Sequence, residues 1–282
     1  MSQHVATRSE ECLQAKHHRI LAGFDGSCTA TAAVEWAARE ASVRCSVLQI
    51  VMAQTVADSV DFYGLGARQT SDLQRLGERL ANLYPALTLD LVTTVADPRD
   101  ALPERAQQAD LLVIGAHESG AVRRLLFGSV ERTAARRSPC PVVIVKGNAA
   151  LRPINRIVVG VDGSNAAEAA LVLAAREADL HRAELVVVHG WDRSERRVDG
   201  QRVVDDAVLA CQSLTDSPVR GELFDGDGAT ALAAASLDAD LVTIGSRGRS
   251  GFRTMLFGSV ALAVAEDATC PVAITHPQLR RA

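Results

Sequence analysis

The chain has 282 residues, of which 48% are hydrophobic and 23% charged, and its formal net charge is −4. This length suits two domains of ordinary size, and the acidic balance with only 4% aromatic residues argues against a nucleic-acid partner. No apolar stretch approaches the roughly 18 residues of a membrane span, and residues 1–16 lack the apolar segment of a signal peptide. We therefore expect a disordered leader at 1–16, no membrane partner and a cytoplasmic protein.

After the leader, short apolar runs alternate with helical patterns. The runs predict strands near 19–24, 45–52, 88–95, 110–115 and 141–145, and the segments between them predict helices near 28–42, 68–83, 99–108 and 127–137. The runs are continuous rather than alternating, which indicates strands buried on both faces. Strands interleaved with helices predict a doubly wound parallel sheet, and such sheets bind ligands at the carboxyl ends of their strands, where the strand order reverses.

The second half of the chain repeats the first. RILAGFDGS at 19–27 matches RIVVGVDGS at 156–164, LFGSV at 126–130 recurs at 256–260, and CPV at 140–142 recurs at 270–272. Strands are accordingly predicted near 156–161, 184–190, 219–224, 240–245 and 271–275. The offset falls from 137 to 130 residues, so the second copy is shortened in its middle, near its second helix. We expect an α/β chain of two tandem, doubly wound, five-stranded parallel-sheet domains at 17–147 and 154–276.

Two segments of the second copy carry the residue types of an anion site. Asp162, Gly163 and Ser164 follow its first strand, where they can cap the next helix or face a ligand, and both interpretations stay open. The fourth strand runs into a glycine- and arginine-rich loop that opens into a Ser-capped helix. The candidate ligand-binding residues there are Gly245, Arg247, Gly248, Arg249, Gly258, Ser259 and Val260.

The first copy departs from this loop at one position, where Glu118 replaces Gly248. A side chain there obstructs the turn, and a carboxylate repels phosphate. The weaker candidates of this copy are Asp25, Gly115, Gly128, Ser129 and Val130. We expect its site to be degenerate.

The remaining polar residues give no catalytic set. His189 and Gly190 end the second strand of the second copy, where the first copy has Gln49 and Ile50; we interpret His189 as structural, and Gly190 as a backbone contact for a base. The sequence has no Walker loop, GxSxG elbow or HExxH helix. Its six cysteines show no zinc-ligand spacing, and we interpret them as small buried residues in a reducing cytosol. No catalytic residue and no metal site is therefore predicted.

One glycine spacing of the second copy is formed by Gly245, Gly248, Gly258 and Ser259, with two residues after the first glycine and nine after the second. This spacing is similar to the ATP-binding motif of the universal stress protein family. The Asp-Gly-Ser turns and Cys-Pro-Val strands resemble that family too, and the Ser-Arg-Gly-Arg loop resembles its tandem members from actinobacteria. The resemblance implies a Rossmann-like fold of the adenine nucleotide alpha hydrolase type. It also implies ATP, with Mg²⁺, as the ligand, Asp162 on the ribose or adenine side, and at most slow hydrolysis.

The family resemblance also implies assembly and role. Strand five of each copy, 141–145 and 271–275, is expected to pair within the chain into a pseudo-dimer, and two chains are expected to associate. The implied role is regulation of the stress response or of growth through an unknown protein partner. Two alternatives stay open: an interaction module that needs no nucleotide, and a very slow ATPase or autokinase.

Overall fold

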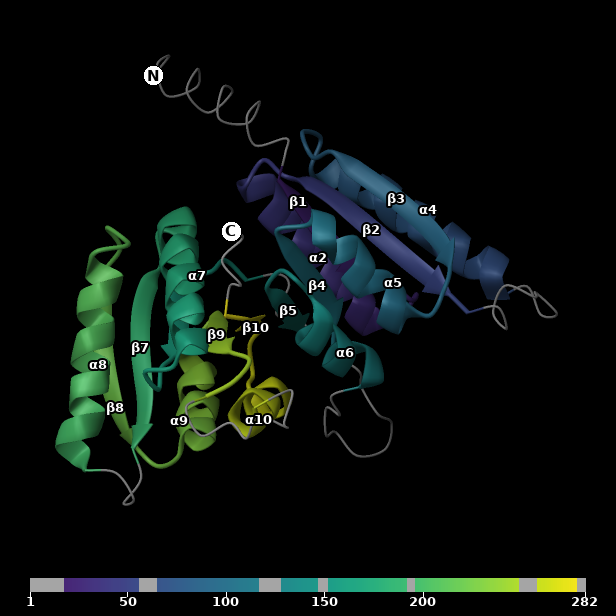
Figure 1. Cartoon of the computed structure of the whole chain (residues 1–282). Helices are drawn as coiled ribbons and strands as arrows, with labels where there is room; N and C mark the ends of the chain where they lie inside the picture. Colours follow the sequence, from purple (N-terminus) through teal and green to yellow (C-terminus); the bar gives the residue numbers. More distant parts are fainter. Residues whose placement is uncertain are drawn as a thin grey trace, which may run out of the picture. The chain divides into compact units, whose positions relative to one another are not determined.

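The computed structural model describes residues 18–55, 65–116, 128–146, 152–191, 196–248 and 258–277, with the backbone alone at 65–67. These residues form two compact units (Figure 1). Domain 1 comprises the described residues up to 146, and domain 2 those from 152 onward. The expected leader at 1–16 lies outside the described residues, as do Glu118 and Arg249.

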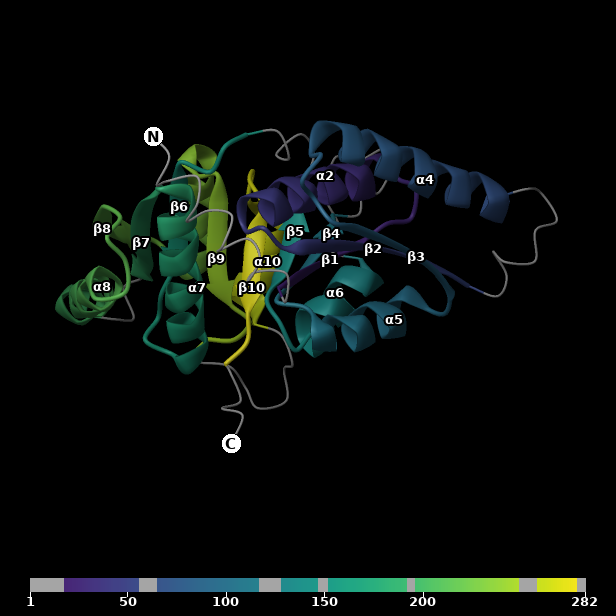
Figure 2. The same ribbon diagram turned by 90° about the horizontal axis from the view of Figure 1, so that it is seen from above.

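Domain 1 alternates strands and helices in the predicted order. Its strands are β1 (Arg19–Gly23), β2 (Val47–Gln54), β3 (Leu89–Val95), β4 (Leu111–Gly115) and β5 (Val142–Val145). Its helices are α2 (Cys28–Val43), α4 (Leu65–Leu83), α5 (Pro98–Arg105), followed by the 3-10 turn η2 (Ala106–Gln108), and α6 (Ser129–Arg137). Figure 2 shows α2 and α4 on one face of the sheet and α5 and α6 on the other.

Domain 2 repeats this order. Its strands are β6 (Arg156–Gly160), β7 (Glu184–Trp191), β8 (Val219–Asp225), β9 (Leu241–Gly245) and β10 (Val272–Thr275). Its helices are α7 (Asn165–His181), α8 (Arg197–Gln212), α9 (Gly228–Ala235), followed by the 3-10 turn η4 (Ser236–Asp238), and α10 (Ser259–Asp267). The offset between the domains is 137 residues at the ends of β2 and β7 and 130 at the starts of β3 and β8. The predicted shortening therefore lies around α8.

Each domain has a parallel sheet with the same strand order. Domain 1 reads β3-β2-β1-β4-β5, and domain 2 reads β8-β7-β6-β9-β10. The chain direction across the sheet reverses between β1 and β4 and between β6 and β9. The predicted fold of two doubly wound five-stranded domains is confirmed, and the carboxyl edge of β6 and β9 becomes the expected place of a ligand.

Most strands are buried on both faces, as predicted, but β3 and β8 are not. The four residues of β5 and of β10 are all buried, whereas β3 and β8 contain exposed and half-buried residues. Continuous burial was therefore wrong for these two strands. Three of the seven residues of β3 and two of the seven of β8 are exposed, at the sheet edges beyond β2 and β7.

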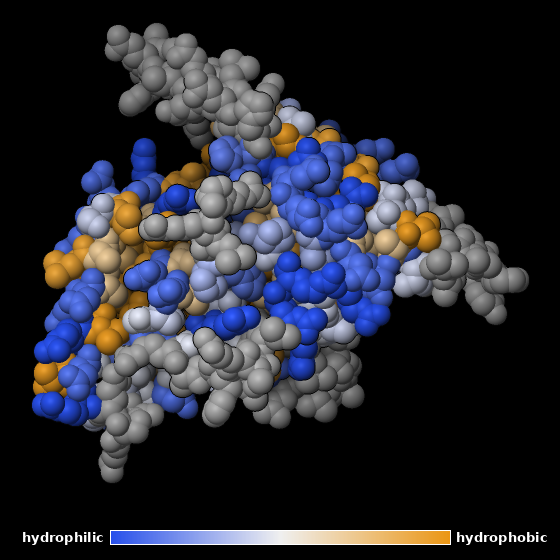
Figure 3. Space-filling model, in the orientation of Figure 1, coloured by the Kyte–Doolittle hydropathy of each residue, from blue (hydrophilic) through white to orange (hydrophobic). Residues whose placement is uncertain are grey.

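The helices that cover the sheets are rich in alanine, which lets their backbones approach the strands closely. Ala33, Ala37 and Ala41 of α2 are completely buried, and so are Ala170, Ala174 and Ala178 of α7. The exposed face of α8 carries isolated apolar residues, among them Val198 and Leu209. Figure 3 shows such hydrophobic side chains scattered between hydrophilic ones over this helix, so they form no continuous apolar face.

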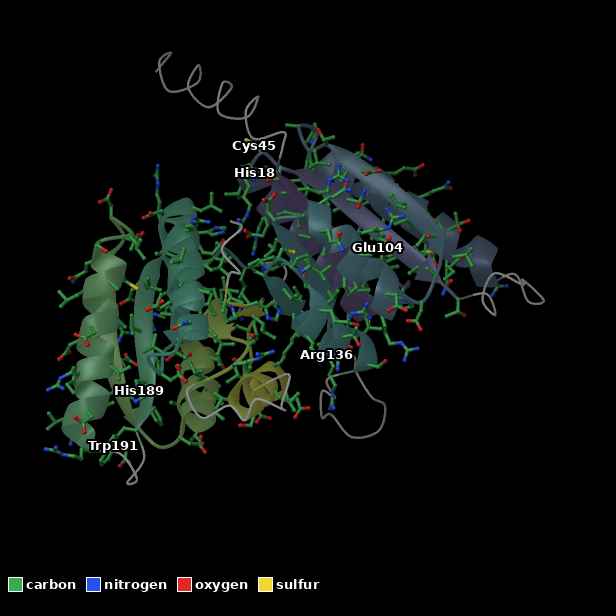
Figure 4. The ribbon with its side chains drawn as sticks, in the orientation of Figure 1. His18, Cys45, Glu104, Arg136, His189 and Trp191 are labelled. Carbon is green, nitrogen blue, oxygen red and sulfur yellow. The ribbon has the colours of Figure 1, made fainter. Side chains whose placement is uncertain are left out.

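Among the cysteines that the structure describes, which exclude Cys12, two differ from the expectation. Cys140, Cys211 and Cys270 are buried free thiols, as predicted, and burial raises the pKa of Cys140 and of Cys211 to about 11. Cys28 is a free but exposed thiol at the start of α2, and Cys45 (labelled in Figure 4) is disulfide-bonded. The interpretation of all six as buried and reduced was therefore wrong for Cys28 and Cys45.

In the part of the chain that the structure describes, no helix is both long and apolar enough to cross a bilayer.

Candidate functional site

The turn after β6 builds the first wall of the site. Gly163 adopts a left-handed backbone with φ +75°, which turns the chain toward α7. The backbone N–H of Ser164 donates to Asp162 Oδ1 at 3.0 Å, and Ser164 Oγ accepts from Ala167 N at 3.2 Å as the N-cap of α7. Ser164 is thus the helix cap, while Asp162 shapes the turn with one oxygen and has its other oxygen facing the neighbouring loop.

That neighbouring loop follows β9 and lies against the turn. Ser164 Oγ reaches the carbonyl of Arg247 at 3.4 Å. A Cβ placed on Gly248 would come within 2.6 Å of Asp162 Oδ2. The absence of a side chain at Gly248 therefore lets the Asp162 carboxylate and the loop backbone approach each other, so these two candidate residues are neighbours in space.

The start of α10 closes the arrangement. Gly258 N donates to the carbonyl of Ser246 at 2.8 Å, and a Cβ on Gly258 would lie 3.5 Å from Arg247 Cα. Gly258, with φ −72°, is the N-cap and makes no side-chain capping bond, and Ser259 is the first residue of the helix. The predicted capping role of Ser259 was therefore wrong. The first helical N–H groups, from Ser259 to Ala261, have no acceptor within the helix and can face an anion.

Two candidate glycines have a packing role. A Cβ on Gly245 would lie 2.6 Å from the backbone carbon of Ala166 in the first turn of α7. A Cβ on Gly190 would lie 2.5 Å from the backbone of Asp227 and Gly228 at the start of α9. Both glycines hold a helix start close to a strand end, and they shape the edge of the sheet on which the site lies.

His189 has the structural role that the sequence favoured. It is buried, with 7% of its surface exposed, and its Nδ1 donates to the carbonyl of Val161 at 2.7 Å. Figure 4 labels it beside Trp191 at the end of β7. The counterpart assigned to it was wrong: the strand pairing aligns Val51 with Val188, which makes Met52 the residue equivalent to His189, rather than Gln49.

Sequence reasoning missed one polar group at this edge. His276 follows β10, and its Nδ1 shares a hydrogen bond of 2.9 Å with Ser246 Oγ. Its Nε2 is buried and has no hydrogen-bond partner among the described residues. Burial first, and the positive charge of Arg247 second, lower the pKa of His276. A histidine directly after a strand at a carboxyl edge was a signal, but it lies outside the repeated motifs, since the first copy has Lys146 at this position.

Domain 1 reproduces the first wall. Gly26 has φ +87°, Ser27 N donates to Asp25 Oδ1 at 2.9 Å, and Ser27 Oγ accepts from Ala30 N at 3.1 Å. A Cβ on Gly115 would lie 2.5 Å from the Thr29 backbone, which repeats the packing of Gly245. The loop with Glu118 lies outside the described residues, but Gly128, Ser129 and Val130 begin α6 as Gly258, Ser259 and Val260 begin α10.

Comparisons with known proteins agree with this architecture. A universal stress protein of Mycobacterium tuberculosis is 30% identical over 300 residues, which cover 92% of this chain and 97% of the relative. Another from the same species is 29% identical over 288 residues, covering 93% and 98%. A crystal structure of a universal stress protein from Archaeoglobus fulgidus has the same fold, with a TM-score of 0.74 at 18% identity over 93% of this chain and 99% of that one.

The family model agrees with these relatives. It is described as the universal stress protein family, and it matches the chain twice, over residues 16–146 and 153–276. Two matches in tandem correspond to the two domains of the structure. The chain therefore belongs to the universal stress protein family, as a member with two family domains in tandem.

Proposed function

We propose that domain 2 binds ATP at the carboxyl edge of β6 and β9. The observation that carries this proposal is the convergence of Asp162, Arg247, Gly248 and Gly258 around the start of α10, where the strand order reverses. Ligands of doubly wound sheets bind at this place. Helix N-terminal N–H groups with glycines that allow close backbone approach suit phosphate oxygens.

Each candidate residue has a role in this proposal. The backbones of Gly248, Gly258, Ser259 and Val260 hold the phosphates, and Arg247 and Arg249 add positive charge. Asp162 faces the ribose or adenine, while Gly163, Gly190 and Gly245 keep the turn and the helix starts in place. The described part of this edge has no group of three metal-ligating side chains. Mg²⁺ would therefore be held by phosphate oxygens and water, with few protein ligands.

The role that we propose is regulatory. Ser246, the hydroxyl that meets His276, is only 1% exposed, which disfavours its use as a nucleophile. In this proposal ATP acts as a bound signal that changes the choice of protein partner under stress, with at most slow hydrolysis, and the family resemblance supports this role. We propose in addition that strand five of each domain pairs within the chain and that two chains associate.

Calorimetric titration tests ATP binding. The wild-type protein is expected to bind ATP, and Gly248→Glu is expected to lose binding because its side chain displaces Asp162 and places a carboxylate beside the phosphates. Leu237→Gln, at a side chain that is 70% exposed on η4, is the control and should bind as wild type does. Equal affinity of all three proteins, or no binding by any, refutes the site.

A further inference from the structure

The first helical turns of α6 and α10 differ at one buried position. Both helices begin after a glycine N-cap with extended backbone, φ −69° at Gly128 and φ −72° at Gly258. The third helical residue is Glu131 in domain 1 and Ala261 in domain 2. Glu131 is 6% exposed, so a carboxylate is buried at the helix start of domain 1 where domain 2 has a methyl group.

The Glu131 side chain folds back over the N-cap glycine. A Cβ on Gly128 would lie 3.1 Å from Glu131 Cδ and 3.2 Å from Oε1, and closer still to Oε2. The carboxylate therefore lies at the positive end of α6, at the glycine that corresponds to Gly258. The N–H groups and the dipole of a helix start attract an anion, and here the chain supplies that anion from its own first turn.

Domain 1 also has a pair of side-chain amides between the end of β2 and the turn after β1. Gln54, at the end of β2, is 8% exposed, and its Nε2 donates to Gln69 Oε1 at 3.2 Å. Gln69 Nε2 donates in turn to the carbonyl of Asp25 at 3.5 Å. These two amides, from β2 and α4, cross from the second strand to the turn after the first. Domain 2 has Trp191 at the position of Gln54, so this chain of amides is a property of domain 1.

We infer that the third residue of the helix after the glycine loop decides which domain accepts a nucleotide. Glu131 occupies the phosphate position of domain 1, and Ala261 leaves that of domain 2 open. The inference rests on the proposed ATP site of domain 2, and it makes the chain a carrier of one nucleotide. The Glu131 carboxylate stabilises the helix start of domain 1 as a bound phosphate stabilises that of domain 2.

Transplanting the residue tests the inference in domain 2. Ala261→Glu is expected to weaken ATP binding at least about tenfold by calorimetry, because its carboxylate meets the phosphates at the helix start. Ala261→Gln has the same size without the charge and should weaken binding clearly less than Ala261→Glu, while Leu237→Gln, outside the site, should bind as wild type does. Similar affinities of the two Ala261 variants overturn the inference. If the wild-type protein does not bind ATP, the proposed function is refuted instead. The inference is then judged by the phosphate experiment on domain 1.

Removing the residue tests the inference in domain 1 without relying on ATP. In a Gly248→Glu background, which disables domain 2, thermal unfolding is followed with increasing inorganic phosphate. Glu131→Ala is expected to gain a phosphate-dependent rise in Tm that its parent lacks, because the helix start is free to bind the anion. Glu131→Gln keeps the side-chain size and should show the same phosphate-dependent rise in Tm. It serves as the test variant if Glu131→Ala folds poorly. A phosphate response equal to that of the parent in both variants overturns the inference.

Discussion

Gly245 and Gly248 belong to one motif, but the neighbours of each differ. A Cβ on Gly245 meets the backbone of Ala166, which cannot move without shifting α7. A Cβ on Gly248 meets the end of the Asp162 side chain, which can rotate. The first glycine therefore serves the packing of the fold, and the second shapes the proposed site.

Alanine substitutions separate these two roles. Gly245→Ala is expected to lower the free energy of unfolding by about 1–3 kcal/mol, the usual cost of overpacking. Gly248→Ala should leave that free energy nearly unchanged but weaken ATP binding about tenfold, the equivalent of about 1.4 kcal/mol, because Asp162 is displaced. Urea unfolding and calorimetry on both variants give the four values. A Gly248→Ala protein that is destabilised as much as Gly245→Ala contradicts this division.

His276 is expected to make the stability of domain 2 depend on pH. Because burial and Arg247 lower the pKa of His276 below its usual 6.5, the unfolded chain takes up a proton at higher pH than the folded chain. The free energy of unfolding should therefore fall as the pH decreases below 6.5. His276→Asn, which keeps a polar group beside Ser246, should flatten this slope in urea unfolding measured between about pH 7 and about pH 5. Identical slopes for both proteins exclude His276 as the cause.

The residues that sequence reasoning missed at the site share one property. Glu131, Gln54 and His276 are buried or half-buried polar residues outside the motif. The role of each depends on its neighbours in the folded structure, which linear spacing does not reveal. Linear spacing picked out Gly248 as a candidate because it is one of the glycines of the family motif. It picked out Asp162 because this acidic residue directly follows a predicted strand. It gave no sign that Glu131 folds back over Gly128, since an acidic residue in a first helical turn is common on any exposed helix.

At the scale of elements, the chain builds the same turn twice. Strand, Asp-Gly-Ser and helix recur with a left-handed glycine and a serine N-cap in both domains. The sequence predicted these elements well because apolar runs of four to eight residues between helical patterns have few other solutions. The prediction failed where burial or strand length depends on the neighbouring strands. These places are the exposed residues of β3 and β8 and the end of β2. That strand continues two residues past its predicted end at 52, because its pairing with β3 extends to Gln54.

The two serine caps should contribute equally. Ser27 and Ser164 accept from the N–H three residues later at 3.1 and 3.2 Å, so Ser27→Ala and Ser164→Ala should each cost about 1 kcal/mol of stability. Only Ser164→Ala should also weaken ATP binding, because Ser164 Oγ touches the Arg247 carbonyl of the proposed phosphate loop. Thermal unfolding and calorimetry of the pair check both statements. A loss of ATP affinity in Ser27→Ala would place a second functional site in domain 1.

At the scale of the whole molecule, duplication has produced two domains with one fold and different helix starts. The first keeps the turn, the packing glycine and the strand order, and it adds the Gln54–Gln69 amide pair beside its turn and the Glu131 carboxylate at its helix start. The second domain has a glycine without a side chain at 248 and only a methyl group at Ala261. If the proposed ATP site is right, domain 1 should be stable without a ligand, whereas domain 2 should gain stability when nucleotide binds.

Hydrogen exchange measures this asymmetry directly. A ligand stabilises only the states that hold its site, by about 2.7 kcal/mol at a hundred times Kd, and exchange reports that gain locally. With saturating ATP, the amides of the turn after β6, of the segment 245–248 and of the first turn of α10 should exchange more slowly. Their equivalents in domain 1, at 25–27, 115–116 and 128–131, should keep their rates. Equal protection in both domains would mean that domain 1 binds nucleotide despite Glu131, and protection in neither would remove ATP as the ligand.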